Sequence, residues 1–183
     1  LLDHALERAE ALVAMLRAEP GCAAAEIAGS LRRRKETIGD VDLVAASDDP
    51  APLLQRFAEH LGVQDVTALG DAKASVVLHD GMQVDLRVIK PAQLGSLLQH
   101  FTGSKGHNVA LRERARSQGL SLSEHGFAPI AGGDAVPCAT EEGVYGQLGL
   151  QWIPPELRED HGEIEAAAAG ALPVLVTLAE LQG

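Results

Sequence analysis

The sequence predicts an α/β (α+β) fold, because two hydrophobic patterns alternate along residues 1–91. Short apolar runs of strand length are separated by segments in which apolar residues recur at helical spacing. After Lys90-Pro91 the composition changes and helical patterns dominate up to residue 183. We therefore expect two parts, a sheet with helices over residues 1–91 and a mostly helical part over residues 92–183.

The first part is predicted to alternate helices and strands. Its helices are bounded by Pro, Gly and Asp signals, and Asp80-Gly81 is a strong hairpin turn signal. In order, we expect a helix over 3–18, strands over 23–28 and 41–46, a helix from Asp48-Asp49-Pro50 to Gly62, a strand over 63–69, and a hairpin over 74–79 and 82–89.

The second part is predicted to be helical with loops. Thr102-Gly103-Ser104 forms a flexible corner between two helices, because glycine lets backbone approach a ligand. The remaining expectations are a helix over 93–99, a helix after Ser104 with Asn108, Arg112 and Arg116 on one side, a short strand over 121–126, a helix capped by Thr140, Trp152 and Ile153 in the core, and a helix over 163–169.

Charge is distributed unevenly along the chain. The net charge of −11 argues against a simple nucleic-acid-binding surface. Residues 1–119 hold 14 basic side chains against 16 acidic ones, whereas residues 120–183 hold one arginine against ten acids. Basic side chains gather at Arg32–Lys35 and at Lys105–Arg116. A nucleic acid would therefore lie across these two patches and avoid the acidic tail.

The cysteines and the hydropathy pattern favour a reducing, cytoplasmic location. Cys22 and Cys138 lack metal-ligand spacing and lie in unrelated segments. No run approaches the roughly 18 apolar residues of a membrane span, and no signal-peptide pattern is present. The chain starts at Leu1 rather than Met, so we expect a fragment of a larger protein.

A phosphate site is predicted at Gly29-Ser30. An apolar strand runs into this pair, and Ser30 is a good N-cap for a following helical turn. Free backbone N–H groups and the positive end of a helix dipole would then face an anion. Taken alone, Gly-Ser is more often an ordinary turn, and a run of arginines is more often a solvated face.

Three aspartates form the second half of this pattern. Asp40 and Asp42 lie two apart on a predicted strand, so their carboxylates point to one side while Val41 points to the core. Adjacent carboxylates repel one another unless a cation lies between them, and Mg²⁺ prefers carboxylate and phosphate oxygens. Taken alone, such a pair is usually a strand end, and Asp85 would usually be a salt-bridged edge residue.

Together these residues resemble the signature of the nucleotidyltransferase superfamily. The string AGSLRRRKETIGDVDLV, with Asp85 in VDLRV, resembles the palm of the family X DNA polymerases, in particular the bacterial ones. The resemblance implies a palm with a mixed β-sheet flanked by helices (residues 1–91), followed by a mostly helical thumb (residues 92–183). It implies that Asp40, Asp42 and Asp85 are catalytic and bind two ions of Mg²⁺ or Mn²⁺.

The resemblance also implies further site residues. The stretch HFTGSKGHN resembles the family motif that contacts the sugar and base of the incoming nucleotide. The implied nucleotide-binding residues are Gly29, Ser30, Arg33, Gly39, His100, Phe101, Gly103 and Asn108. The implied DNA-binding residues are Lys73, Lys105, Arg112 and Arg116, and Arg87 is implied to hold a carboxylate when substrate is absent.

The sequence departs from the family pattern at three of these places. His100-Phe101 stands where vertebrate members have Tyr-Phe, and Lys105 where they have an acidic residue. Arg34 stands where many members have Gly. Sugar discrimination and the detailed base contact therefore do not follow from the resemblance.

The function implied is DNA-directed DNA polymerisation by a two-metal mechanism, with gap filling in DNA repair. The partners would be a deoxynucleoside triphosphate and primer–template or gapped DNA, without a membrane, in the bacterial cytoplasm and at most associated with the nucleoid. The resemblance also implies that helix-hairpin-helix and PHP-type domains, which lie outside this sequence, flank the region in the full-length protein. Two alternatives stay open: a nucleotidyltransferase with a non-DNA acceptor, and a DNA-binding fragment with little turnover.

Overall fold

A five-stranded mixed sheet organises the first half of the molecule. The structure, a computed structural model, describes residues 2–176. The strand order is β1-β2-β5-β4-β3; β2 and β5 are parallel, and the other neighbours are antiparallel. The strands are β1 (Ala24–Ile27), β2 (Asp40–Ala46), β3 (Val63–Leu69), β4 (Lys73–Leu78) and β5 (Gln83–Ile89). The predicted mixed sheet is confirmed.

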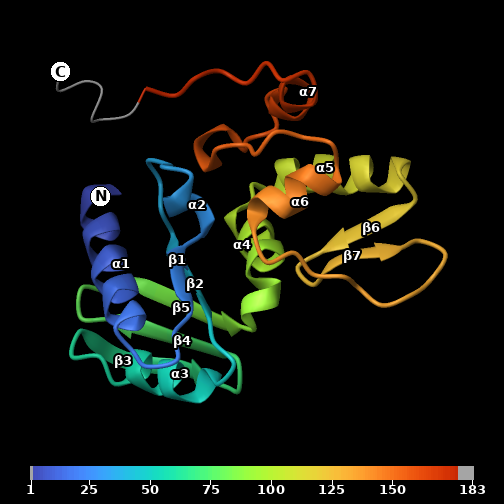
Figure 1. Ribbon diagram of the computed structural model, residues 1–183. Helices are drawn as coiled ribbons and strands as arrows, with labels where there is room; N and C mark the ends of the chain where they lie inside the picture. Colours follow the sequence, from blue (N-terminus) through green and yellow to red (C-terminus); the bar gives the residue numbers. More distant parts are fainter. Residues whose placement is uncertain (1, 177–183) are drawn as a thin grey trace.

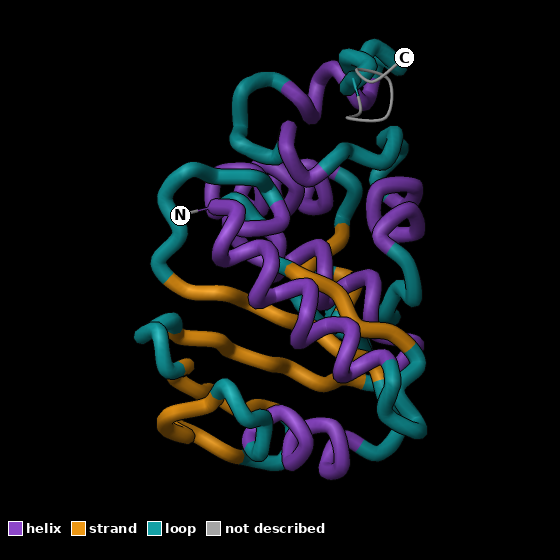
Figure 2. Tube along the Cα trace, turned by 90° about the vertical axis from the view of Figure 1, so that its left-hand side faces the viewer, coloured by secondary structure: helices purple, strands orange, loops and turns teal. Residues whose placement is uncertain are grey.

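One face of the sheet is covered by α1 (Leu2–Arg17) and α3 (Pro50–Ala58). Figures 1 and 2 show the long helix α1 lying against β1 and β2. Alternate strand residues point into this core because successive side chains of a strand face opposite ways. They include Val41, Leu43, Val84 and Leu86, all buried against leucines of the two helices.

The other face is covered only in part, by α4 (Leu94–Thr102). Its Leu97 and Leu98 pack on Val44, near the carboxyl end of β2. The amino end of β2 carries Asp40, which is exposed, so the sheet face there is open. The fold thus leaves one patch of the sheet free, beside the turn that joins β1 to α2 (Gly29–Arg32).

The second half has its own hydrophobic core. It contains α5 (Lys105–Ser117), the hairpin of β6 (Leu120–Ser123) and β7 (Gly126–Pro129), α6 (Glu141–Gln147) and α7 (Glu163–Ala168), with 3₁₀ turns at Pro91–Gln93 and Pro155–Leu157. Leu111, Tyr145, Leu148 and Ile153 are fully buried in this core. α4 joins the two halves, since it packs on both β2 and α6 (Figure 1).

Gly95 explains how α4 approaches α6 so closely. A Cβ atom at this position would overlap the backbone of Thr140, the residue that caps α6. The backbone of Gly95 instead donates a hydrogen bond to Ala139 O at 3.1 Å. The predicted cap is confirmed, because Thr140 Oγ1 accepts a hydrogen bond from the Gly143 backbone N–H at 3.2 Å.

Three local predictions are wrong. Ser30 lies inside α2 and does not cap it; the N-cap is Ala28, without a side-chain hydrogen bond. Trp152 is 37% exposed, whereas Ile153 is buried as expected. The indole Nε1 of Trp152 donates to the buried Glu141 Oε1 at 3.4 Å. The helix predicted to run to Gly62 ends at Ala58, before a turn in which the Gly62 N–H donates to His60 Nδ1.

The described helices include no membrane span. Among residues 2–176, no helix combines the length and the apolar character that crossing a bilayer requires.

Candidate active site

The register between β2 and β5 brings the aspartates together. The two strands are parallel neighbours, and Asp42 is directly paired with Asp85. Paired residues on adjacent strands point to the same face, and neighbouring strands lie about 4.8 Å apart. Asp40, two residues before Asp42, shares that face. The structure therefore places all three predicted carboxylates on the open face of the sheet.

The Gly29-Ser30 turn lies against Asp42. Gly29 has φ of 63°, and a Cβ atom there would overlap the Asp42 carboxylate. The Ala28 backbone N–H donates to Asp42 O at 2.8 Å, which fixes the turn to β2. Only glycine at this position lets the turn come so close to the carboxylate. The predicted phosphate turn and the predicted metal ligands thus share one place.

The electrostatics of Asp42 reflect this crowding. Burial, together with the charges of Asp85 and Asp40, raises the pKa of the Asp42 carboxyl to about 6. The cations Arg87 and Lys73 lower this pKa but do not outweigh the other effects. A carboxylate that is half-buried beside two others favours a proton or a cation.

Asp85 is held by its own neighbours. Ser75, which is paired with Asp85 across β4 and β5, donates its hydroxyl to Asp85 Oδ1. Gln83 Nε2 donates to Asp85 Oδ2 at 3.4 Å, and Lys73 Nζ lies 3.9 Å from Oδ1. Sequence reasoning did not identify Ser75 or Gln83. Gln83 alternates with Asp85 on β5, and Ser75 lies opposite Asp85 in the predicted hairpin, so hairpin pairing was the signal that could have found them.

The donor set suits a hard divalent cation. The three carboxylates offer only oxygen, and burial together with the charges of Asp85 and Asp40 raises the pKa of Asp42. Among residues 2–176, however, no three Asp, Glu, His or Cys side chains converge closely enough to hold a metal ion. Binding a metal would therefore require at least the Asp85 oxygens to turn away from Ser75 and Gln83.

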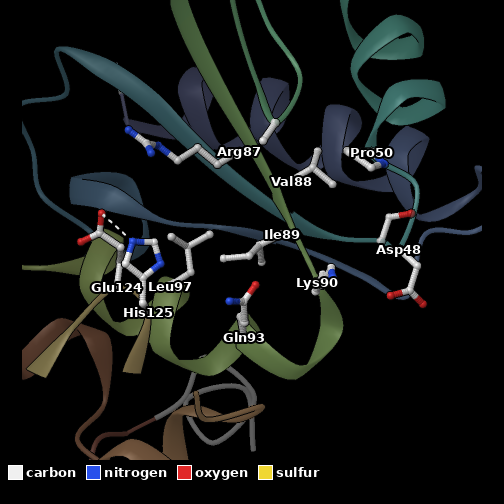
Figure 3. A pocket seen from close by; sticks show the side chains of 12 residues that line it. Asp48, Pro50, Arg87, Val88, Ile89, Lys90, Gln93, Leu97, Glu124 and His125 are labelled. Carbon is white, nitrogen blue, oxygen red and sulfur yellow. Dashed lines mark ion pairs between the residues drawn. The ribbon is translucent and has the colours of Figure 1, made fainter. Parts of the chain in front are cut away.

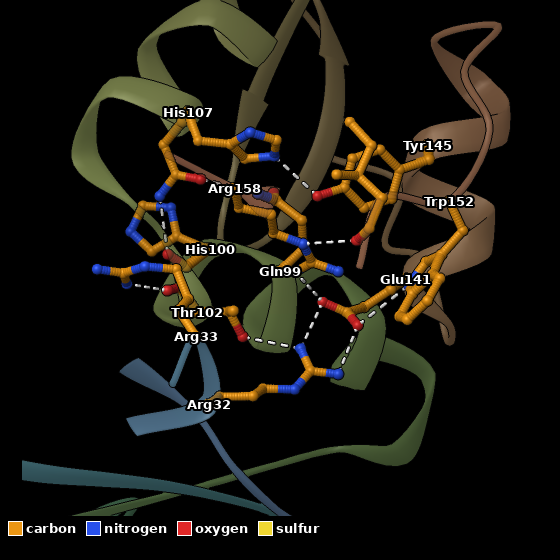
Figure 4. A network of polar contacts seen from close by, with 12 residues as sticks. Arg32, Arg33, Gln99, His100, Thr102, His107, Glu141, Tyr145, Trp152 and Arg158 are labelled. Atoms are coloured by element: carbon orange, nitrogen blue, oxygen red, sulfur yellow. Dashed lines mark hydrogen bonds and ion pairs between the residues drawn. The ribbon is translucent and has the colours of Figure 1, made fainter. Parts of the chain in front are cut away.

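The arginines of the basic turn are paired with the second half of the molecule. Arg32 makes a two-pronged contact with Glu141, through Nη1 to Oε2 at 2.8 Å and Nη2 to Oε1 at 2.7 Å (Figure 4). Arg33 donates from Nε to Glu159 Oε1 at 2.8 Å and from Nη1 to Thr102 O at 2.5 Å. Two side chains expected to face phosphate or solvent thus join the two halves.

Arg34 shows why the turn accommodates a departure from the family pattern. Its φ is 60°, in the left-handed region that favours glycine. Many family members have Gly at this position. Arg34 adopts this left-handed conformation with an exposed side chain.

Arg87 lies on the same face as Asp85 but stacks elsewhere. Its guanidinium carbon lies 4.3 Å from the centre of the Phe101 ring. Arg87 also lines a cavity of about 390 Å³ with Glu124 and His125, between the end of β5, α4 and the β6–β7 turn (Figure 3). Among the described residues, Lys73 forms an ion pair with the aspartate cluster, with Nζ 3.9 Å from Asp85 Oδ1, whereas Arg87 forms none.

The residues of the HFTGSKGHN stretch surround the corner between α4 and α5. The His100 and Phe101 rings meet edge to face, with centroids 5.4 Å apart. Asn108 accepts from Gln99 Nε2 and donates to His100 O, both at 2.8 Å. Gly103 has φ of 67° and lies beside the Arg33 guanidinium. The corner is therefore adjacent to the basic turn, through Arg33.

The remaining predicted residues lie at or near the protein surface. Gly39, Lys73, Lys105 and Arg116 are exposed, and Arg112 is half-buried. Lys105 begins α5, whose first turn is capped by Ser104 Oγ accepting from the His107 N–H at 3.3 Å. Of these cations, Lys73 already lies at ion-pair distance from Asp85.

Glu141 and Glu159 are the important residues that sequence reasoning missed. Glu141 accepts from both Arg32 and the fully buried Arg158, which lies 2.6 Å away (Figure 4). Although burial alone would raise the pKa of Glu141, these two arginines lower it to about 2. Glu141 lies 109 residues after Arg32 in the sequence, and Glu159 lies 126 residues after Arg33. No local sequence pattern therefore indicates these two contacts.

Comparison with known proteins decides which family carries this arrangement. The DNA polymerase beta thumb family matches residues 97–159. The DNA polymerase/3'-5' exonuclease PolX of Bacillus subtilis (strain 168) is 37% identical over 158 residues, covering 85% of this chain and 27% of that protein. The chain belongs to the family X DNA polymerases.

Two eukaryotic members of family X are also similar. DNA polymerase lambda of Rattus norvegicus is 26% identical over 159 residues, covering 72% of this chain and 28% of that protein. DNA-directed DNA/RNA polymerase mu of Homo sapiens is 36% identical over 78 residues, covering 42% of this chain and 16% of that protein. The chain spans about a quarter of the length of the first two relatives. In family X terms, the sheet with its helices forms the palm and the helical half contains the thumb.

Proposed function

We propose that this chain is the nucleotidyl-transfer core of a DNA-directed DNA polymerase, which adds a deoxynucleoside monophosphate to a primer 3′ hydroxyl during gap filling in DNA repair. The observation that carries this proposal is the pairing of Asp42 with Asp85 on the open palm face, beside the Gly29-Ser30 turn. The three relatives are named as DNA polymerases, which favours DNA over other acceptors.

The three aspartates would hold Mg²⁺ or Mn²⁺ after the Asp85 side chain turns away from Ser75.

 The donor set for these ions is Asp40, Asp42 and Asp85. Two bound divalent cations would supply charge neutralisation for the attacking and leaving oxygens of an in-line displacement. In that displacement the primer 3′ oxygen bonds to the α-phosphorus, the bond to the β-phosphate oxygen breaks, and pyrophosphate leaves.

The other residues would bind and orient the nucleotide. Backbone N–H groups of Gly29 and Ser30, together with Arg33, would donate to the β- and γ-phosphates. Asp85 would face the primer 3′ hydroxyl. His100, Phe101 and Gly103 would lie against the sugar, and Asn108 against the base.

DNA would lie along the exposed cations. Lys73 on β4 and Arg112 on α5 would contact the template, and Lys105 and Arg116 would extend this basic surface. We also place the protein in the bacterial cytoplasm, because Cys22 and Cys138 are both free thiols. These assignments follow the similarity to family X and the exposure of the side chains.

Primer extension on gapped DNA tests the proposal. The purified chain is incubated with a one-nucleotide gapped duplex carrying a labelled primer, one complementary deoxynucleoside triphosphate, and Mg²⁺ or Mn²⁺. We expect the primer to grow by one nucleotide. A parallel reaction with labelled nucleotide and no DNA should give no labelled product, because the HFTGSKGHN corner and the basic helix serve DNA synthesis.

Other results would favour the alternatives. Label transferred in the reaction without DNA would indicate a different acceptor. Gapped DNA bound in a mobility-shift assay but not extended with either metal ion would indicate a DNA-binding fragment. Either result contradicts the proposed polymerase activity of the chain.

A further inference from the structure

Arg33, which we propose binds phosphate, is already hydrogen-bonded to residues of the helical half. Arg33 Nε donates to Glu159 Oε1 at 2.8 Å, and its Nη1 donates to Thr102 O. The Arg33 side chain is 13% exposed and that of Glu159 20% exposed, so the pair is largely shielded from solvent. Figure 4 shows Arg33 directed toward Thr102 at the end of α4.

A carboxylate on a guanidinium takes the place that a phosphate oxygen would take. Both are anionic oxygen acceptors that fit the planar N–H donors of arginine. Since Nε and Nη1 of Arg33 are already engaged, a triphosphate can use these donors only after Glu159 and Thr102 release them. The Glu159 contact and the phosphate contact are therefore mutually exclusive on the Nε donor.

Glu159 is ionised in this position. Burial alone would raise the pKa of its carboxyl, but the hydrogen bond and charge of Arg33 and the charge of Lys35 together lower it. Lys35 Nζ lies 3.5 Å from the same oxygen, Oε1. Glu159 therefore has a second cation that can hold it when Arg33 leaves.

The chain around Glu159 is fixed, so the exchange involves side chains. The preceding residue, Arg158, is fully buried and bound to Glu141. The following Asp160 and His161 both donate their backbone N–H to Glu163, at 2.9 and 2.7 Å. With the backbone held on both sides, only the Glu159 and Arg33 side chains are free to change partners.

We propose that Glu159 is a built-in competitor of the incoming nucleotide, which holds Arg33 until the triphosphate displaces it and leaves Glu159 with Lys35. This inference rests on the proposed function, in which Arg33 binds the β- and γ-phosphates. It assigns to Glu159 a control of nucleotide affinity. The thumb thereby sets how tightly the palm binds its substrate.

The test compares Glu159→Gln with the wild type. Glutamine keeps the size and one acceptor oxygen and removes only the charge that competes with phosphate. We expect the Kd for a deoxynucleoside triphosphate with Mg²⁺, measured by calorimetry, to fall roughly threefold to tenfold, as the loss of one partly shielded ion pair implies. The KM for gap filling should fall with it, while kcat changes less.

Glu156→Gln is the matched control. Glu156 is exposed, lies three residues before Glu159 in the 3₁₀ turn Pro155–Leu157, and makes no ion pair among the described residues. This variant makes the same change of net charge and should leave Kd and KM at wild-type values. Thermal unfolding of both variants shows whether each is folded.

Opposite results overturn the inference. A higher Kd and KM for Glu159→Gln would show that Glu159 positions Arg33 for phosphate instead of competing with it. An unchanged Kd would show that the ion pair does not oppose binding. Inorganic tripolyphosphate, titrated in the same way, reports the exchange without any chemistry and should follow the nucleotide.

Arg33→Gln separates this inference from the proposed function. If the wild type binds nucleotide and Arg33→Gln weakens that binding, the proposed phosphate site stands and Glu159→Gln alone decides the competition. If binding does not depend on Arg33, the assigned phosphate contact is wrong and the competition by Glu159 is overturned with it.

Discussion

Asp42 is the residue at which fold and function meet. It is paired with Asp85, lies against the Gly29 turn, and has a carboxyl pKa raised to about 6. A pKa raised in the folded protein means that the protonated form is favoured by folding. The associated stability is fully present below the unfolded pKa and is lost as pH rises through about 6.

Asp42→Asn should therefore stabilise the metal-free protein at alkaline pH. We expect its free energy of unfolding at pH 8 to exceed that of the wild type by about 1 to 2 kcal/mol, after discounting the shift for partial exposure. The difference should vanish below about pH 3, where the wild-type carboxyl is protonated in both the folded and the unfolded state, since its unfolded pKa is 3.8. Urea unfolding at the two pH values measures it.

Asp65→Asn provides the control, because Asp65 is exposed on the edge strand β3 of the same sheet. It should show no comparable gain at pH 8. An Asp42→Asn protein that is less stable than the wild type at pH 8 would mean that Asp42 is held by favourable contacts and is not strained by its neighbours.

At this scale the sequence predicted the orientation of the aspartates but not the partners of the arginines. Alternation along a strand is a local rule, so Asp40, Asp42 and Asp85 could be assigned to a face before the sheet was known. The contact of Arg33 with Glu159 joins residues 126 apart, and only tertiary packing decides it.

Among the elements, the contact of α2 with α6 connects palm and thumb. Arg32 on α2 and Arg158 share the buried carboxylate of Glu141, the first residue of α6. The fully buried Arg158 depends on this contact, because its Nη2 has no hydrogen-bond partner. Removing the carboxylate would leave a buried cation uncompensated.

Glu141→Ala should consequently destabilise the protein strongly. We expect a loss of about 3 to 5 kcal/mol in the free energy of unfolding at pH 7, measured in urea, because two arginines lose their partner. The neighbouring exposed Glu142, changed to Ala, should stay within about 0.5 kcal/mol of the wild type.

The pH dependence gives a second check. Because the pKa of Glu141 is lowered to about 2, its contribution to stability is present above the unfolded pKa and is lost as pH falls toward 2. Glu141→Ala should lack this part of the acid-induced loss. If it loses stability below pH 4 as steeply as the wild type does, the assigned ion pairs are not what holds α6.

At the scale of elements, sequence patterns located most helices and strands, including the hairpin of β4 and β5 and the cap at Thr140. Helix starts and side-chain burial that depend on tertiary contacts were less predictable from the sequence. Ser30 has the chemistry of a cap, yet the close contact of Gly29 with Asp42 sets where α2 begins. Trp152 has the hydrophobicity of a core residue, yet it is 37% exposed, with its indole N–H directed to the buried Glu141.

Across the whole molecule, the acidic C-terminal region is used internally. The sequence suggested that DNA would avoid it, but Glu141, Glu159 and Glu163 bind cations or His107 within the protein. Arg32 and Arg33 are correspondingly withdrawn from the surface. Of the predicted DNA-binding residues, Lys73, Lys105 and Arg116 stay exposed.

The central claim is that the open palm face, with its three aspartates, is where nucleotidyl transfer takes place. Asp85→Ala tests this claim with Asp65→Ala as a control for charge and sheet position. Both variants are checked for folding by thermal unfolding. Nucleotide binding is then measured by calorimetry before any turnover assay.

The decisive measurement is the single-turnover rate of one-nucleotide gap filling with Mg²⁺. The account predicts that Asp85→Ala loses about a thousandfold or more of this rate while it still binds nucleotide, and that Asp65→Ala behaves as the wild type does. Gap filling by Asp85→Ala at the wild-type rate would contradict it.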